Sequence, residues 1–294
     1  MDSSSSTPDD HSAELQRVRG RLAGTSTCEW ERLQSTPVTR IEYLITSHCL
    51  ARHLPSNGLV LDAGCGPGRY AVDLVEQGYQ VVLFDLMHSY LAFARAKIAD
   101  AGDAPGAGEF ASCTQGDLAA LPYPDGAFDV VLCLGAPLSY MLEQPARHRA
   151  VQELARVAKP GRLVFLTGIG RLACYRGGIY WGLWDMWDLF TTPEAQATGL
   201  AAGYDAWYTF APDELEALAE DAGLDVVDRV GCEGLAAYLP MKNLKTIEAH
   251  PTRWPIWRDI LLKTCNEPSI VGMSNHLLVV ARKDEQRTRS AVDA

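Results

Sequence analysis

The sequence lacks an excess of positive charge. It carries 26 Lys and Arg against 37 Asp and Glu, which gives a formal net charge of -11 at pH 7. Affinity for nucleic acid rests largely on Lys and Arg side chains that neutralise phosphates. The composition therefore argues against a broad surface for DNA or RNA.

Long hydrophobic runs are also missing. There is no run of eighteen apolar residues and no leader in which a basic stretch precedes an apolar one. Membrane-spanning helices and secretory signals depend on such segments. We therefore expect a cytoplasmic protein without a membrane partner.

Paired cysteines are absent too, because the eight cysteines form no C-x-x-C pair and no His stands at the spacing of a zinc ligand. This scatter predicts buried thiols in a reducing compartment and no metal site. The cysteines are Cys28, Cys49, Cys65, Cys113, Cys133, Cys174, Cys232 and Cys265.

The chain contains enough hydrophobic residues to form a large core. Its 294 residues are 47% hydrophobic, which suits one large domain or two small ones. Residues 1–12 and 283–294 lack apolar periodicity, so we expect them to be disordered. The remaining 13–282 are predicted to form a single domain.

The segment VLDAGCGPGRY, residues 60–70, predicts a buried strand that turns through a glycine-rich loop into a helix. Glycines at alternate positions let the backbone approach a ligand, and the N-terminal amides of the following helix face it. Asp62 ends this strand, and Asp85 ends the next hydrophobic run. In a doubly wound sheet, an acid at that second position can accept both hydroxyls of a ribose. Arg69 stands where the dinucleotide fingerprint needs its third glycine, which disfavours a nicotinamide cofactor.

Predicted strands and helices then alternate along the chain, and alternation of this kind implies an α/β fold with a parallel sheet between helices. Reversal of strand order would place a crevice at the carboxyl ends of the first and fourth strands. Residues 62–68 and 134–140 both lie at that crevice. The predicted elements are 59–62, 69–76, 80–84, 88–99, 110–114, 128–133, 145–158, 162–167, 212–222, 225–230, 239–266 and 277–281.

Three segments together resemble a known family. They are the D-x-G-x-G-x-G loop with Asp85 beyond it, QGDL at 115–118 before the turn LPYPD, and AFDVVLC at 127–133. In order and spacing they resemble the small-molecule type of class I S-adenosylmethionine (SAM) dependent methyltransferases, over residues 40–168. The resemblance implies a doubly wound, Rossmann-like, mostly parallel sheet of seven strands with an antiparallel last strand. It also implies that the helical residues 13–54 cover the cofactor.

The resemblance further implies SAM as the cofactor, with S-adenosylhomocysteine (SAH) as its product. Asp85 would take the ribose diol, and Asp117 with Leu118 would meet the adenine. Arg40 or Tyr43 would reach the carboxylate of SAM, unless they are a solvated arginine and a core tyrosine. The other implied contacts are Asp62, Gly64, Cys65, Gly66, Gly68, Leu86, Met87 and Leu134.

Two of these residues have more than one interpretation. The Asp62 carboxylate either bonds the amino group of SAM through water or fixes the amides of its own loop. Cys65 either has a redox or nucleophilic role or is a small side chain beneath the cofactor.

The segment LGAPLSY, residues 134–140, bears on the acceptor. Methyltransferases that act on nucleobase or glutamine nitrogens carry Asn or Asp followed by Pro-Pro-aromatic here, and that tetrapeptide is missing. Ser139 and Tyr140 are candidate substrate contacts; the alternative is a helix cap and a core ring. The sequence singles out no general base among His48, His88, His148, His250 and His276, so the catalytic residues stay unknown, with Tyr140 and His276 as candidates.

An aromatic-rich stretch interrupts the pattern after residue 168. Long insertions at a functional edge are often binding loops or lids, so we expect residues 171–210 and 239–266 to form a substrate lid. Trp181, Trp184 and Tyr204 are candidate contacts for a flat or cationic acceptor. The alternative is hydrophobic packing of the lid or a dimer contact.

Together these observations predict a SAM-dependent methyltransferase that acts on O, N or C of a small molecule, as a monomer or homodimer. One alternative is a methyltransferase that acts on RNA or protein. The other is a SAM-binding protein with a structural or non-methylating role.

Overall fold

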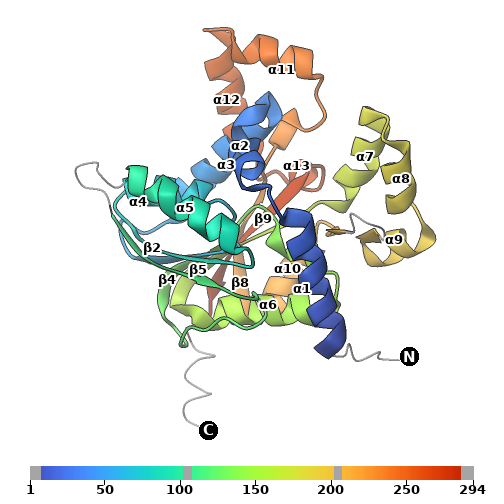
Figure 1. Cartoon of the computed structure of the whole chain (residues 1–294). Coiled ribbons are helices and arrows are strands. Elements are labelled where there is room, and N and C mark those ends of the chain that lie inside the picture. The colour runs from blue at the N-terminus through green and yellow to red at the C-terminus, as the bar shows by residue number, and fades with distance from the viewer. Residues whose placement is uncertain (1–7, 102–107, 202–206, 286–294) are drawn as a thin grey trace.

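The computed structural model describes residues 8–101, 108–201 and 207–285 (Figure 1). Its centre is a seven-stranded sheet in the order β3-β2-β1-β4-β5-β9-β8. The first five strands pair in parallel, whereas β9 runs antiparallel to both β5 and β8. This confirms the predicted α/β class and the antiparallel last strand.

The strands of the sheet lie close to their predicted positions. They are β1 (Leu59–Ala63), β2 (Gln80–Asp85), β3 (Glu109–Gln115), β4 (Phe128–Cys133), β5 (Ala158–Ile169), β8 (Leu224–Gly231) and β9 (His276–Lys283). A separate ribbon pairs β6 (Leu200–Ala201) with β7 (Trp207–Tyr208). The central strands are continuous apolar runs because helices cover the sheet on both faces.

Each face of the sheet has its own hydrophobic core. One core joins Leu61 and Val131 to α6 (Gln144–Val157) and α10 (Glu214–Asp221). The other joins Val60 and Val130 to α3 (Pro37–His53), α4 (Arg69–Glu76) and α5 (His88–Ala101). Neighbouring residues of one strand thus enter opposite cores, as the pleat requires.

The N-terminal helices begin earlier than expected. Helix α1 spans Pro8–Leu22, followed by α2 (Ser26–Ser35) and α3, whose start carries a capping box of Thr36 and Thr39. The prediction of disorder through residue 12 was wrong for residues 8–12, because His11 and its neighbours on α1 contact segments more than a hundred residues away. Similarly, Lys283 ends β9, where its ammonium donates to two carbonyl oxygens. Residues 1–7 and 286–294 lie outside the described residues.

The two predicted insertions are helical and project from the sheet in different directions (Figure 1). The first contains α7 (Arg171–Trp181), α8 (Trp184–Phe190) and α9 (Pro193–Thr198). The second contains α11 (Met241–Glu248) and α12 (Arg253–Thr264), followed by α13 (Pro268–Val271). Short 3-10 helices, η1 (Pro137–Tyr140) and η2 (Gly234–Ala236), complete the fold. Within the described ranges, every helix is too short or too polar to cross a membrane.

Candidate active site

A cavity lies at the carboxyl ends of the parallel strands. Its walls come from the loops after β1, β2, β3 and β4, and α1 and α2 cover it. This edge of an open α/β sheet is where such folds usually bind their ligands. The predicted cofactor residues that line it are Asp62, Gly64, Cys65, Gly66, Asp85, Leu86, Asp117, Leu118 and Leu134.

Asp85 holds two turns of the cavity wall together. Its Oδ2 accepts a 2.8 Å hydrogen bond from the Gly66 amide, and its Oδ1 accepts one of 2.8 Å from the Met87 amide. Burial raises the pKa of Asp85 to about 6, although these amide bonds oppose the rise. The carboxylate is thus fixed at the edge where a ribose would lie, and it keeps lone pairs for further donors.

Asp62 lies beside Asp85 at the end of β1. Burial, and then the charge of Asp85, raise the pKa of Asp62 to about 7. The loop amides bond elsewhere: Gly64 and Cys65 donate to the Phe84 carbonyl, and Gly66 donates to Asp85. These contacts leave the Asp62 carboxylate to face the cavity, which favours the interpretation in which it meets an amino group.

Each of the three loop glycines is needed for a different structural reason. All three have positive φ, at 74° for Gly64, 54° for Gly66 and 82° for Gly68. A Cβ on Gly64 would come within 2.5 Å of Pro137, and one on Gly68 within 2.6 Å of Ala94. A Cβ on Gly66 would meet nothing within 4 Å. Gly66 therefore leaves open space toward the cavity, whereas Gly68 packs α4 against α5 and does not line the cavity as predicted.

Cys65 lines the same loop. Burial raises the pKa of its thiol well above the usual value, with the charges of Asp85 and Asp62 adding to the effect. A reactive cysteine needs the opposite shift. The structure therefore favours a small thiol in the cavity wall over a nucleophile.

Three further predicted cofactor contacts lie outside the cavity. The Arg40 guanidinium is bound to Glu248 on α11 at 2.6 and 2.5 Å, so the structure does not support its role at the SAM carboxylate. The Tyr43 hydroxyl donates to Asp73 at 2.5 Å, and burial together with that carboxylate raises the pKa of Tyr43 to about 12. Met87 is buried, and Leu86 takes the cavity position instead.

Arg69 was not predicted as a contact, yet it lines the cavity at the start of α4. Its guanidinium lies over the rings of Trp30 and Tyr43, at 4.8 and 5.2 Å from the ring centres. Its Nε is buried with no hydrogen-bond partner among the described residues. Arg69 is thus better placed than Arg40 to meet a carboxylate.

The segment after β4 contains both predicted acceptor contacts, Ser139 and Tyr140, but only Tyr140 lines the cavity. Ser139 is fully buried and its Oγ accepts a hydrogen bond of 2.9 Å from the Ile169 amide, which ties η1 to β5. The prediction for Ser139 is therefore wrong, because its side chain is used inside the fold. Tyr140 does line the cavity.

The aromatic insertion does not reach the described cavity. None of the described residues from 171 to 210 lines it, and neither do any from 239 to 266. Trp184 is 57% exposed and packs its ring on Trp187 at 6.3 Å. The structure therefore contradicts a role for Trp184 in this cavity. The side chain of Trp181 and all of Tyr204 lie outside the described residues.

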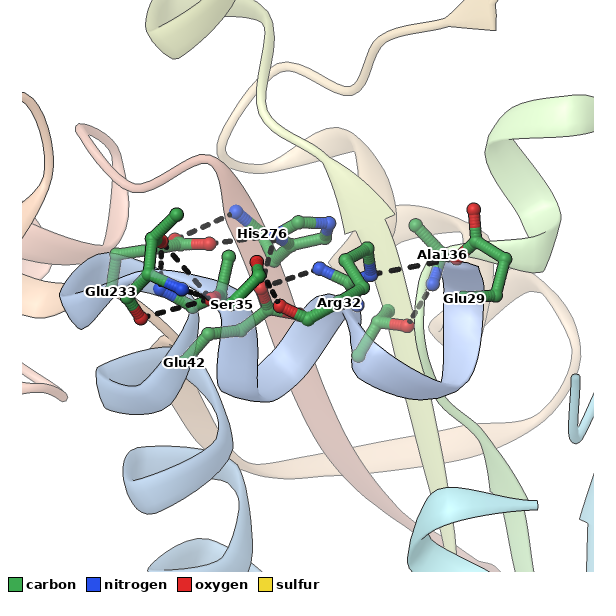
Figure 2. Close-up of polar contacts among 10 residues, drawn as sticks. Glu29, Arg32, Ser35, Glu42, Ala136, Glu233 and His276 are labelled. Carbon is green, nitrogen blue, oxygen red and sulfur yellow. Dashed lines mark hydrogen bonds and ion pairs between the residues drawn. The ribbon is translucent and has the colours of Figure 1, made fainter. Parts of the chain in front are cut away.

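His276 belongs to a buried ionic network instead of the cavity lining (Figure 2). Its Nδ1 lies 2.6 Å from Glu233 Oε1 and 3.7 Å from Glu42 Oε2. Glu42 in turn accepts two hydrogen bonds from Arg32, of 2.7 and 2.9 Å. Arg32 lines the cavity, so the network supports its wall. His276 is therefore not placed as the catalytic base.

Charge balance in this network shifts two pKa values. Burial disfavours the charged form of His276, but Glu42 and Glu233 outweigh it and raise the pKa of His276. Burial likewise opposes the charge of Glu42, yet His276 and Arg32 hold its pKa below the usual value. The ligand atoms of Glu42, Glu233 and His276 lie within 4.8 Å of one another, as in a metal site. Because Arg32 already occupies both oxygens of Glu42, we describe the set as an ion-pair network.

Helix α1 supplies the lining residues that sequence reasoning missed. His11 Nε2 lies 2.5 Å from Asp117 Oδ2, and Arg17 donates a 3.0 Å hydrogen bond to the Tyr140 carbonyl. Leu15, Val18 and Leu22 line the cavity from the same helix. Their spacing of three and four residues was the available signal.

The family model of a methyltransferase domain matches residues 60–161. That segment contains the glycine loop, Asp85, Asp117 and the strand before residue 134. Residues 60–161 belong to the class I SAM-dependent methyltransferase family.

The chain is similar to several known proteins. It is 30% identical over 174 residues to a ubiquinone biosynthesis O-methyltransferase of Pseudomonas paraeruginosa. The alignment covers 58% of this chain and 66% of that relative. It is 34% identical over 122 residues to a malonyl-[acyl-carrier protein] O-methyltransferase of Erwinia pyrifoliae, in an alignment that covers 38% of each protein. A solved SAM-dependent methyltransferase from Methanosarcina mazei shares the fold at 19% identity and a TM-score of 0.54, over 80% of this chain and 97% of that one. The chain spans about two fifths to two thirds of the length of the curated relatives it matches.

Proposed function

We propose that this methyltransferase transfers the methyl group of SAM to an oxygen, nitrogen or carbon atom of a small-molecule acceptor. The observation that carries the proposal is the single cavity that the cofactor loops share with α1 and α2. Beyond the loops, Leu15, Val18, Leu33 and Met141 make this cavity apolar. Alignment of donor and acceptor in a water-poor pocket is the main requirement of an in-line displacement.

The residues of the cavity fit SAM. When bound, SAM supplies an electrophilic methyl group on a sulfonium sulfur. Asp85 would hold the ribose hydroxyls, Asp62 the amino group and Arg69 the carboxylate of the methionine part. The open space at Gly66 gives the cofactor room at the loop, and Leu86 offers an apolar surface to the adenine.

Enclosure of the cavity supports a small acceptor over RNA or a protein surface. Helix α1 crosses the opening, where His11 bonds Asp117 and Arg17 bonds the Tyr140 carbonyl. The net charge of -11 adds no support for a phosphate-rich partner. An RNA or protein acceptor and a non-methylating role remain the outcomes that would replace the proposal.

Thermal unfolding with SAH, SAM and NAD added separately tests the cofactor. A ligand at a hundred times its dissociation constant stabilises a protein by about 2.7 kcal/mol, so SAH and SAM should raise the melting temperature and NAD should not. An increase with NAD alone would overturn the assignment. The Asp85→Ala variant is the control, since it should lose the SAH effect.

A methyl-acceptor screen tests the substrate class. Methyl-labelled SAM is incubated with the protein and, in parallel, with a small-molecule library, total RNA and a protein lysate. We expect label to enter the small-molecule fraction. Label in RNA or protein would overturn the proposed acceptor, and failure to label any fraction despite SAH binding would favour a non-methylating role.

A further inference from the structure

Glu14 of α1 lines the cavity, and one of its carboxylate oxygens accepts no hydrogen bond from the described residues. Its side chain is 7% exposed and lines the cavity. Oε1 accepts hydrogen bonds from the amides of Leu142 and Glu143, the latter at 3.2 Å. Oε2 is buried and has no hydrogen-bond partner among the described residues. An acceptor atom in this condition carries a desolvation cost unless a ligand donates to it.

Contacts on both sides fix the position of Glu14. His11 lies between two carboxylates, with Nε2 at 2.5 Å from Asp117 Oδ2 and Nδ1 at 3.5 Å from Glu14 Oε2. The amides of Leu142 and Glu143 hold the other oxygen at the segment after η1. The Glu14 side chain is therefore held in a fixed position in the cavity wall and is not an exposed acid of the helix surface.

Other polar side chains outside the cofactor loops are already engaged. Arg32 is bound in two places to Glu42, and Glu29 lies 3.6 Å from Arg32. The hydroxyl of Tyr90 lies 2.5 Å from Thr25 Oγ1. Glu14 differs from these groups in having a buried oxygen that accepts no hydrogen bond from the described residues, although His11 Nδ1 lies 3.5 Å from it.

We propose that Glu14 binds the methyl acceptor through an O–H or N–H group of the acceptor and receives its proton. This inference rests on the proposed function. The lone pair of the acceptor atom forms the new bond to the methyl carbon while the carbon–sulfur bond breaks and its electron pair stays on sulfur. The proton leaves the acceptor atom for Oε2 of Glu14, and solvent takes it after product release.

The charges around the cavity select the class of acceptor. Its lining contains the acids Glu14, Glu29, Asp62, Asp85 and Asp117. Among the described lining residues the arginines are Arg32, which is paired with Glu42, and Arg69, which is assigned above to the cofactor. Arg17, Arg147 and His11 lie near Glu14 without lining the cavity. An anionic acceptor would face like charge, whereas a hydroxyl group or a neutral amine, which keeps its lone pair, on an apolar body fits both the acid and the walls. The acceptor class is therefore an apolar or aromatic alcohol, phenol or amine.

Matched probe pairs test this proposal without knowledge of the natural acceptor. SAH-saturated protein is titrated, by ligand-observed NMR, with catechol against 1,2-dimethoxybenzene and with benzylamine against toluene. We expect the donor-bearing member of at least one pair to bind about tenfold more tightly, which is the scale of a hydrogen bond to a charged group. The pair that shows the difference tells whether O–H or N–H is recognised.

Glu14→Gln is the decisive variant. Gln keeps a carbonyl oxygen for the two amides but places an NH₂ donor where Oε2 stands, so the tenfold preference should disappear while SAH affinity stays within about threefold. Glu31→Gln on the exposed side of α2 removes the same charge and should keep the preference.

Equal affinity of the unmodified protein for both members of each pair would overturn the inference. So would a failure of all four probes to bind. A preference that survives in Glu14→Gln would overturn it as well. Failure of SAH to bind the unmodified protein is a separate result, because it would remove the proposed function itself.

Discussion

The amide of Gly66 donates a hydrogen bond of 2.8 Å to Oδ2 of Asp85. The other oxygen of the same carboxylate accepts from the Met87 amide. One side chain therefore connects the glycine loop after β1 with the turn after β2. Loss of Asp85 would affect both the proposed ribose contact and the loop that surrounds it.

Replacement of Asp85 by Ala should weaken SAH binding by about 1.5 to 3 kcal/mol, the scale of hydrogen bonds to a charged group. Isothermal titration calorimetry measures the change directly. Asp100→Ala removes an exposed acid from α5 and should bind SAH normally. Equal affinity in both variants would exclude Asp85 as the ribose contact.

Asp62→Asn should stabilise the protein in the absence of cofactor at pH 8. The carboxyl ionises at about 7 when folded against 3.8 when unfolded, so the unfolded chain loses its proton first as pH rises. Ionisation therefore costs stability progressively from about pH 4 to 7, and fully above 7. At about 1.36 kcal/mol per pKa unit the gain from Asn is on the order of a few kcal/mol.

Urea unfolding at pH 8 and pH 4 measures this gain, which should vanish at the lower pH. The same substitution should weaken SAM binding, because the amino group of SAM loses its charged partner. A variant that is no more stable at pH 8 than the unmodified protein would refute the raised pKa of Asp62.

Gly66→Val should abolish SAH binding, because the new side chain enters the open space where a Cβ meets nothing within 4 Å. Backbone strain from a positive φ accompanies any such change. Gly24→Val is the matched control, with φ at 76°, an equally open Cβ position and a place outside the cavity. It should share the strain but keep SAH affinity by calorimetry; loss of binding in both variants would mean that strain alone is responsible.

His276→Gln should destabilise the protein most in mildly acidic solution. The raised pKa of His276 stabilises the fold below about 6.5, and this contribution is lost as pH rises through the folded value. The lowered pKa of Glu42 stabilises the fold above about 4.5 and is lost as pH falls through its folded value. The network therefore contributes most between about pH 4.5 and 6.5.

Breaking a buried ion pair of this kind costs about 3 kcal/mol. We expect a loss of that order at pH 6 and a smaller one at pH 9, measured by urea unfolding. The control is His88→Gln at the exposed start of α5. A loss in His276→Gln that does not change with pH would show that His276 is neutral when buried.

The sequence predicted the sheet and the cofactor loops well, because both depend on local patterns. Asp62 and Asp85 stand next to the strands that position them, and parallel strands bring their carboxyl ends together. The eight elements from the first strand through the fifth were expected within about four residues of their observed bounds.

Residues positioned by distant partners could not be predicted in the same way. Arg40 has helical neighbours that suit a cofactor contact, but Glu248 on α11 binds it, 208 residues later. Trp184 stands in an aromatic cluster whose composition indicates a pocket, although its helix projects away from the cavity. Composition reports what a segment can bind, whereas only the long-range packing decides which surface it reaches.

Helix α1 has a consequence for the order in which the chain is assembled. It is synthesised before its docking partners at residues 117 and 140–143, which follow more than a hundred residues later. Contacts of such sequence separation form late in folding because the intervening loop must close first. We therefore expect the sheet and its glycine loop to form while the cavity is still open, with α1 docking over it afterwards.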